Sequence, residues 1–138
     1  MSNVHTGVLI TGTVGGIGRA LCEAFRAAGY RVVATDRSGT QFADHSFLPL
    51  DLVRLVDDES VRSEFRCQVL EVLGDVPLGV LVNNAAVQTL GPVHGLSLAA
   101  FRHSMDINLT APLALVASFL DVLSAQRGVA INIGSVHA

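Results

Sequence analysis

Lysine is missing from this chain of 138 residues, because all nine basic residues are arginine. Tyrosine occurs once and cysteine twice. Charged residues make up 15% of the sequence and the net charge is −3, so neither a basic surface for nucleic acid nor a like-charged tail is expected. Cys22 and Cys67 lack the spacing of metal ligands. Both fall in helical patterns, which predicts core thiols in a protein of the reducing cytoplasm.

Long uninterrupted apolar runs are also absent. Polar residues and a proline interrupt the most apolar stretch, residues 107–123, so no membrane span is predicted there. We expect instead a long helix that is buried on more than one face. Such a helix leaves an apolar patch unless another segment or subunit covers it, which predicts a homo-oligomer formed through residues 105–126. The first residues do not have the pattern of a secretory leader, and secretion is not expected.

Histidine does not suggest a metal centre either. The spacing of the histidines does not match a metal site, and we expect those outside the last residues to be solvated or locally hydrogen-bonded. These residues are His5, His45, His94 and His103.

The pattern of apolar segments predicts one α/β domain over residues 1–138, with a hydrophobic content of 50% that suffices for a core. Strands alternate with helices, as in a doubly wound parallel sheet of Rossmann type with strand order 3-2-1-4-5. The expected strands are residues 8–10, 31–35, 47–50, 78–82 and 129–133. The expected helices begin near residues 17, 59 and 98, and the last of them, with Ser97 as its cap, runs on into the long apolar helix.

A glycine-rich turn lies between the first strand and the first helix. Backbone N–H groups and the positive end of the helix dipole point from such a turn toward an anion, and glycine lets a pyrophosphate approach closely. The spacing is G-x-x-x-G-x-G rather than the common G-x-G-x-x-G, and the alternative is a turn that only joins the two elements. The candidate cofactor-binding residues here are Gly12, Val14, Gly15, Gly16, Ile17 and Gly18.

An acidic residue, Asp36, ends the second strand, about as far beyond the glycines as the residue that binds an adenosine ribose. A carboxylate accepts hydrogen bonds from the ribose hydroxyls and repels a 2′-phosphate, which favours NAD over NADP. Arg37, the next residue, argues for NADP instead, since a guanidinium could pair with a 2′-phosphate.

Several further polar groups follow the strands of the predicted sheet. Asp51, Asn84 and Ser135 come after the third, fourth and fifth strands. In a doubly wound sheet, ligands bind at the carboxyl ends of the strands, where the strand order reverses. The sequence therefore predicts one site assembled from strand ends.

These motifs resemble those of the short-chain dehydrogenase/reductase family across essentially the whole chain. The family's T-G-x-x-x-G-x-G motif is matched by Thr11 to Gly18, and its N-N-A-G signature by Asn83 to Ala86, with Ala86 replacing the glycine. The resemblance implies cofactor contacts from Asp51, Leu52, Asn84, Ala85 and Ala86. It also implies that Ser135 and Asn108 are catalytic, with the serine holding the substrate oxygen and the asparagine helping to position a water.

The family's reaction is hydride transfer between nicotinamide and an alcohol or carbonyl carbon, and it uses a tyrosine and a lysine to move a proton. This chain has no lysine, and its sole tyrosine, Tyr30, begins the second strand, where packing is its expected role. The resemblance therefore implies an incomplete domain, truncated before the Tyr-x-x-x-Lys segment, with little or no turnover alone. The alternative is a non-catalytic nucleotide-binding or dimerisation module.

The sequence offers one clue to the substrate. Gln88, after the fourth strand, and His137, after Ser135, resemble the positions that bind the carboxylate in 3-hydroxybutyrate dehydrogenases of this family. The alternative is an ordinary loop glutamine and a surface histidine.

Overall fold

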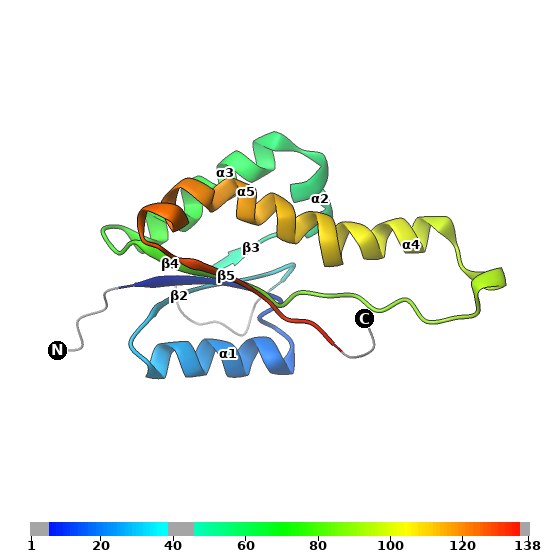
Figure 1. The fold of residues 1–138 in the computed structure, drawn as a ribbon, viewed down its shortest axis with the longest axis horizontal. Coiled ribbons are helices and arrows are strands. Elements are labelled where there is room, and N and C mark those ends of the chain that lie inside the picture. The colour runs from blue at the N-terminus through cyan, green and yellow to red at the C-terminus, as the bar shows by residue number, and fades with distance from the viewer. Residues whose placement is uncertain (1–5, 39–45, 136–138) are drawn as a thin grey trace.

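The computed structural model describes residues 6–38 and 46–135 and contains one parallel sheet of five strands (Figure 1). The strand order is β3-β2-β1-β4-β5, as predicted. Every neighbouring pair is parallel. The strands are β1 (Gly7–Thr11), β2 (Arg31–Asp36), β3 (Phe47–Pro49), β4 (Leu78–Asn83) and β5 (Val129–Asn132).

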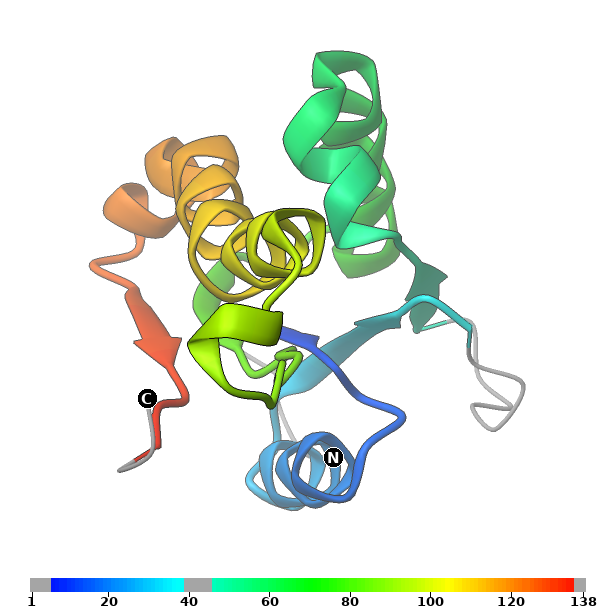
Figure 2. The same ribbon diagram turned by 90° about the vertical axis from the view of Figure 1, so that its right-hand side faces the viewer.

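Helices cover both faces of the sheet, as the end-on view shows (Figure 2). One face carries α1 (Gly16–Ala27) and the other carries α2 (Leu52–Asp57), α3 (Glu59–Leu73) and α5 (Ala111–Ala125). A short 3₁₀ turn, η1 (Val93–Gly95), and helix α4 (Leu98–Met105) precede a π-helical turn, η2 (Asp106–Thr110), which leads into α5. Strands β1 and β4 are buried along their whole length because helices cover both faces of the sheet there, whereas every residue of the edge strand β5 is exposed.

Alternate strand residues fill two separate cores. Leu9, Val33 and Leu81 lie in the cluster with α3 and α5. Val8 and Ile10 lie in the other cluster, against α1. Because successive side chains of a strand point to opposite faces, each central strand contributes to both cores. The carboxyl ends of β1, β2 and β4 are thereby held in one rigid row.

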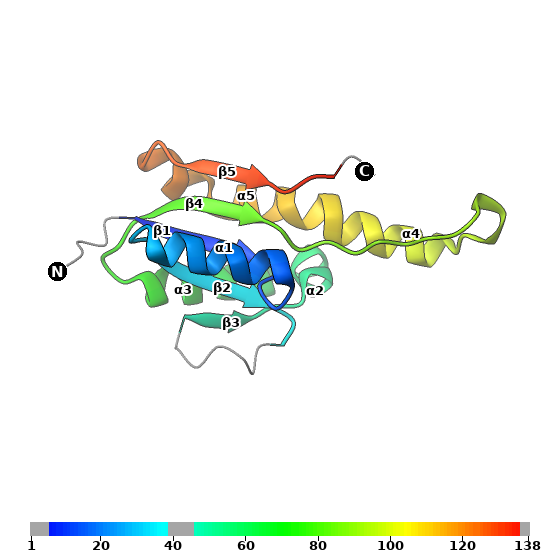
Figure 3. The same ribbon diagram turned by 90° about the horizontal axis from the view of Figure 1, so that it is seen from below.

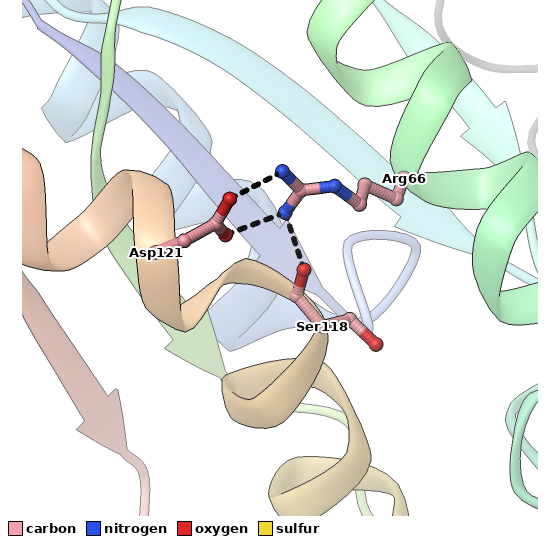
Figure 4. A network of polar contacts seen from close by, with 3 residues as sticks. All are labelled: Arg66, Ser118 and Asp121. Atoms are coloured by element: carbon pink, nitrogen blue, oxygen red, sulfur yellow. Dashed lines mark hydrogen bonds and ion pairs between the residues drawn. The ribbon is translucent and has the colours of Figure 1, made fainter.

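Arg66 of α3 ties that helix to α5 above the sheet (Figure 4). Its guanidinium donates two parallel hydrogen bonds to the Asp121 carboxylate, with N–O distances of 2.9 and 2.8 Å, and a third bond to the main-chain oxygen of Ser118. It also lies 5.8 Å from the centre of the Phe119 ring. The hydrogen bond from Arg66 lowers the pKa of Asp121 below its ordinary value.

The long helical segment is buried on one side only, so the prediction of burial on more than one face is wrong. Its buried residues recur every four positions: Ile107, Ala111, Leu115, Phe119 and Leu123. The last four of them belong to the core on this face of the sheet. Between them, Leu109, Leu113 and Leu120 remain 59%, 68% and 56% exposed. By length and composition the continuous helix Leu98–Ala125 is apolar enough to cross a membrane, but its buried stripe belongs to the core.

Two other details differ from the sequence-based expectations. Cys22 is buried as predicted, whereas Cys67 is exposed, so the prediction of two core thiols is wrong for Cys67. Phe65 and Val69 of α3 are buried in the hydrophobic core, whereas Cys67, which lies between them in the sequence, is exposed on the other side of the helix. Helix α2 was not predicted at all, because six residues are too few to show a helical period.

Sheet edges and helix starts follow the expected pattern more closely. The view from the α1 side shows β3 and β5 as the two edge strands (Figure 3). The segment after β4 runs outward alongside α4 in the same view. Ser97 caps α4 as predicted, its hydroxyl oxygen accepting from the Ala100 N–H.

Candidate functional site: a cavity at the strand ends

A cavity of about 590 Å³ opens at the carboxyl ends of β1, β2 and β4. The first turns of α1 and α2 and the α4–η2 segment complete its walls. Every predicted cofactor-binding residue except Val14 lines it. The structure adds lining residues that the sequence did not single out for the cofactor: Thr11, Thr35, Leu50, Val53, Val87, His103 and Ile107.

The glycine turn is tightly folded at two of its glycines. Gly12 has a φ of +69°, and a Cβ there would lie 2.7 Å from the Ala85 Cα. A Cβ on Gly18 would lie 2.7 Å from the Thr13 Cα and would overlap the Gly12 carbonyl oxygen. No atom lies within 4 Å of the corresponding position at Gly16. Gly12 and Gly18 therefore allow the close backbone contacts of the turn, and Gly16 leaves open space in the cavity wall.

Helix α1 starts at the cavity, and no side chain caps its first N–H groups. Its N-cap is Gly15, and no side-chain hydrogen bond caps the helix. The first N–H groups of a helix have no partner within it and attract anions. The turn thus has the features expected of a phosphate cradle.

Hydrogen bonds made by the side chains of Thr11 and Asn84 join the ends of β1 and β4. The Thr11 hydroxyl oxygen accepts from the N–H groups of Asn84 and Ala85, both at 3.0 Å. The Asn84 amide donates to the carbonyl oxygens of Thr11 and Gly12 at 3.0 and 3.1 Å. Asn84 was predicted as a cofactor contact, and the structure shows that its side chain also holds the glycine turn in place.

Asp36 lies at one end of the cavity, beside the glycine turn. One carboxylate oxygen accepts from the Val14 N–H at 3.0 Å and the other accepts from the Arg37 N–H at 2.7 Å. Val14 thus acts through its main chain, beside the cavity. Arg37 is exposed and also lines the cavity, so that an acidic and a basic residue both border the end of the cavity at β2.

The opposite wall of the same end is formed by α2 and the α4–η2 segment. Asp51 caps α2, one of its carboxylate oxygens accepting from the Val53 N–H at 2.9 Å. Ile107 is buried, whereas His103 is exposed, as expected, and both line the cavity. Four-residue spacing puts these two on one helix face, but the sequence did not show that this face borders the site.

Asn108 uses its side chain to hold the segment after β4. Its Oδ1 accepts from the Val87 N–H at 2.9 Å and its Nδ2 donates to the Val87 carbonyl oxygen at 2.8 Å. A second bond of 2.8 Å, between the hydroxyls of Thr89 and Ser104, continues this attachment to α4. The wall at Ala86 and Val87 is therefore positioned by the long helix.

The remaining predicted residues lie outside the cavity lining. Ser135 and Gln88 are exposed and do not line it. His137 falls outside the described residues, so the role of the Gln88–His137 pair stays a prediction. Tyr30 packs as predicted, edge-on against Phe25 with ring centres 5.1 Å apart. Among residues 6–38 and 46–135, no group of three histidine, cysteine or acidic side chains could hold a metal ion.

Comparison with known proteins agrees with the fold. The family model described as short chain dehydrogenase matches residues 6–138. A short-chain dehydrogenase of Penicillium ochrochloron, ptmH, is 32% identical over 133 residues, which cover 94% of this chain and 48% of that protein. The chain spans about half the length of the curated relatives it matches.

Solved structures show the same arrangement. A metagenomic short-chain oxidoreductase in complex with NADP has a TM-score of 0.83 at 29% identity, covering 99% of this chain and 64% of the other. An oxidoreductase from Brucella ovis in complex with a partially ordered NAD has a TM-score of 0.76 at 24% identity, covering 93% and 61%, and this likeness concerns the fold alone. With the glycine turn, the strand order and the family match over residues 6–138 in agreement, the chain belongs to the short-chain dehydrogenase/reductase family.

Proposed function

We propose that this chain is the cofactor-binding part of an NAD-dependent oxidoreductase that acts on an alcohol or carbonyl substrate. The observation that carries the proposal is the Asp36 carboxylate, which borders the cavity and is hydrogen-bonded to the main chain of the glycine turn. Each of its oxygens has a lone pair beyond the one used by a backbone N–H, and these can accept from ribose hydroxyls. The same negative charge disfavours a 2′-phosphate.

The cavity fits the other parts of a dinucleotide. Open space over Gly16 and the uncapped start of α1 suit the pyrophosphate. We assign the end of the cavity bordered by Asp51 and Leu52 to adenine, because the Asp51 carboxylate can accept from the base's amino group there. When bound, the cofactor supplies a nicotinamide ring that gives or takes a hydride.

At the substrate end we assign roles to two residues. Ser135 follows β5 and is the group that would hold the substrate oxygen. Asn108 is a positioning residue, because its amide holds Val87 and so sets the wall formed by Ala86 and Val87.

Turnover by this chain alone is not expected. General acid–base groups contribute about 10²- to 10⁴-fold to rate, and here the chain has no lysine. Tyr30 is packed against Phe25 within the α1-side core. The same facts favour the second candidate, a nucleotide-binding or dimerising module without catalysis. Both candidates bind the cofactor in the same cavity.

The proposal predicts that NADH binds this chain at least tenfold more tightly than NADPH. A fluorescence titration of the reduced nicotinamide ring measures both dissociation constants on the same sample. Equal affinities would contradict the NAD assignment. Tighter binding of NADPH would also contradict it and would make Arg37 the residue that selects NADP over NAD. Cytoplasmic location stays a prediction, and it is compatible with the absence of a disulfide bond at Cys22 and Cys67 in the described part of the chain.

We also propose that a second copy of the chain covers the exposed side of α5. Sedimentation should show a dimer or larger species, and glutamate at Leu113 and Leu120 together should shift it toward monomer, because burying two carboxylates is costly. Ala20→Glu on the exposed side of α1 is the control and should leave the mass unchanged. A wild-type monomer at concentrations of about 100 μM would contradict this proposal.

A further inference from the structure

His103 is the one histidine among the described residues of the cavity wall, and the cofactor motifs provide no role for it. It lies on α4, one helical turn before Ile107 of η2, and both residues line the cavity. Ile107 is 8% exposed and packed inward, whereas His103 is exposed. Because η2 packs against α2, the helix that begins after Asp51, this face of the α4–η2 segment borders the end of the cavity assigned to adenine.

The imidazole of His103 has no polar partner among the described residues. Within residues 6–38 and 46–135 it makes no hydrogen bond or ion pair, while Ser104 beside it is bonded to Thr89 and Asn108 to Val87. The neighbouring polar groups of α4 and η2 therefore serve to hold the segment after β4. His103 remains available to a ligand.

His103 is also the one planar ring among the described residues that line the cavity. The side chains around the adenine end are aliphatic, namely Leu50, Leu52, Val53 and Ile107. Purine bases favour stacking on flat side chains, histidine included. Asp51 can meet the polar edge of a base there, and the ring of His103 can lie against its face.

We propose that His103 stacks on the purine face of the cofactor's adenosine and is an affinity determinant for that half of the dinucleotide. The proposal rests on the proposed function, because it takes the cavity to be a dinucleotide site. An exposed ring at the rim can pack on the base without any change in the backbone, since Ile107 already anchors the helix one turn deeper.

The test compares His103→Ala, His103→Phe and His103→Gln with the wild-type chain. NADH is titrated by its own fluorescence, and ADP-ribose, which has the adenosine half but no nicotinamide, is measured by competition. His103→Ala should weaken both ligands by the same factor of about three to ten, and His103→Phe should stay within about twofold of wild type. His94→Ala, an exposed histidine of η1 outside the cavity lining, is the matched control and should change neither affinity.

Three outcomes would overturn the stacking role. Unchanged affinities in His103→Ala would remove it, and a loss for NADH but not for ADP-ribose would place His103 at the nicotinamide end. Affinity retained by His103→Gln but lost in His103→Phe would show a hydrogen bond in place of stacking. A wild-type chain that binds neither ligand would instead refute the dinucleotide site itself, so the two failures are distinguishable.

Discussion

Replacing Gly18 with alanine is expected to lower the free energy of unfolding by about 3 kcal/mol and to abolish NADH binding. The added methyl carbon would lie 2.7 Å from the Thr13 Cα and 2.8 Å from the Gly12 carbonyl carbon. Both are backbone atoms, so no side chain can rotate away to make room. The turn would have to open, and it would take the start of α1 with it.

Gly16→Ala is the matched control for that change. Gly16 is the first residue of α1, and no atom lies within 4 Å of the position of a Cβ there. The free energy of unfolding should stay the same or rise by up to about 1 kcal/mol, because alanine restricts the unfolded chain more than glycine does. Since the methyl group enters the cavity, NADH binding should still weaken.

Urea unfolding and an NADH titration on the two variants measure both effects. The expected pattern is lost stability and lost binding in Gly18→Ala, but only weakened binding in Gly16→Ala. If Gly18→Ala were as stable as Gly16→Ala, the tight contact between the turn and the first turn of α1 would be wrong.

Replacing Asp36 with asparagine should weaken NADH binding by about 10- to 100-fold and strengthen NADPH binding. Hydrogen bonds to a charged group are worth about 1.5–3 kcal/mol, which corresponds to that range of affinity. Asparagine keeps an oxygen that can accept from the Val14 N–H, so the glycine turn should retain its shape. Loss of the negative charge leaves Arg37 free to attract a 2′-phosphate.

Asp57→Asn is the control for the loss of one negative charge. Asp57 is exposed at the end of α2 and does not line the cavity, so the ratio of NADH to NADPH affinity should not change. Both dissociation constants are obtained from the same titrations as for the wild type. If Asp36→Asn kept the wild-type ratio, the Asp36 carboxylate would serve only to hold Val14.

Much of the architecture could be predicted because its signals are local. Apolar runs at 8–10 and 78–82 are buried strands, and Ser97 caps the helix that follows it. The glycine turn and Asp36 could be placed at one edge because parallel strands bring their carboxyl ends together. The family motifs added Asp51, Asn84 and Ala85, and the structure places all three in the cavity wall.

Other features depend on which surfaces meet. Cys67 and Leu113 lie in segments with an apolar pattern, yet both face away from the core because α3 and α5 each bury only one side. The side chain of Asn108 is hydrogen-bonded to the main chain of Val87, and spacing alone does not show this contact between residues 21 positions apart. Ser135 and Gln88 follow strand ends as expected, but neither reaches the cavity lining.

By itself, the sequence determined the strand order, the glycine turn between β1 and α1, the carboxylate at the end of β2 and the lack of a lysine. These follow from backbone periodicity, from glycine's freedom and from composition, which are properties of short segments. Only the tertiary structure decided that His103 lines the cavity at the strand ends, that Asn84 and Asn108 hold backbone segments, and that α5 leaves an apolar side exposed. These depend on how distant helices and strands pack against one another, and packing is set by the whole core rather than by any one segment.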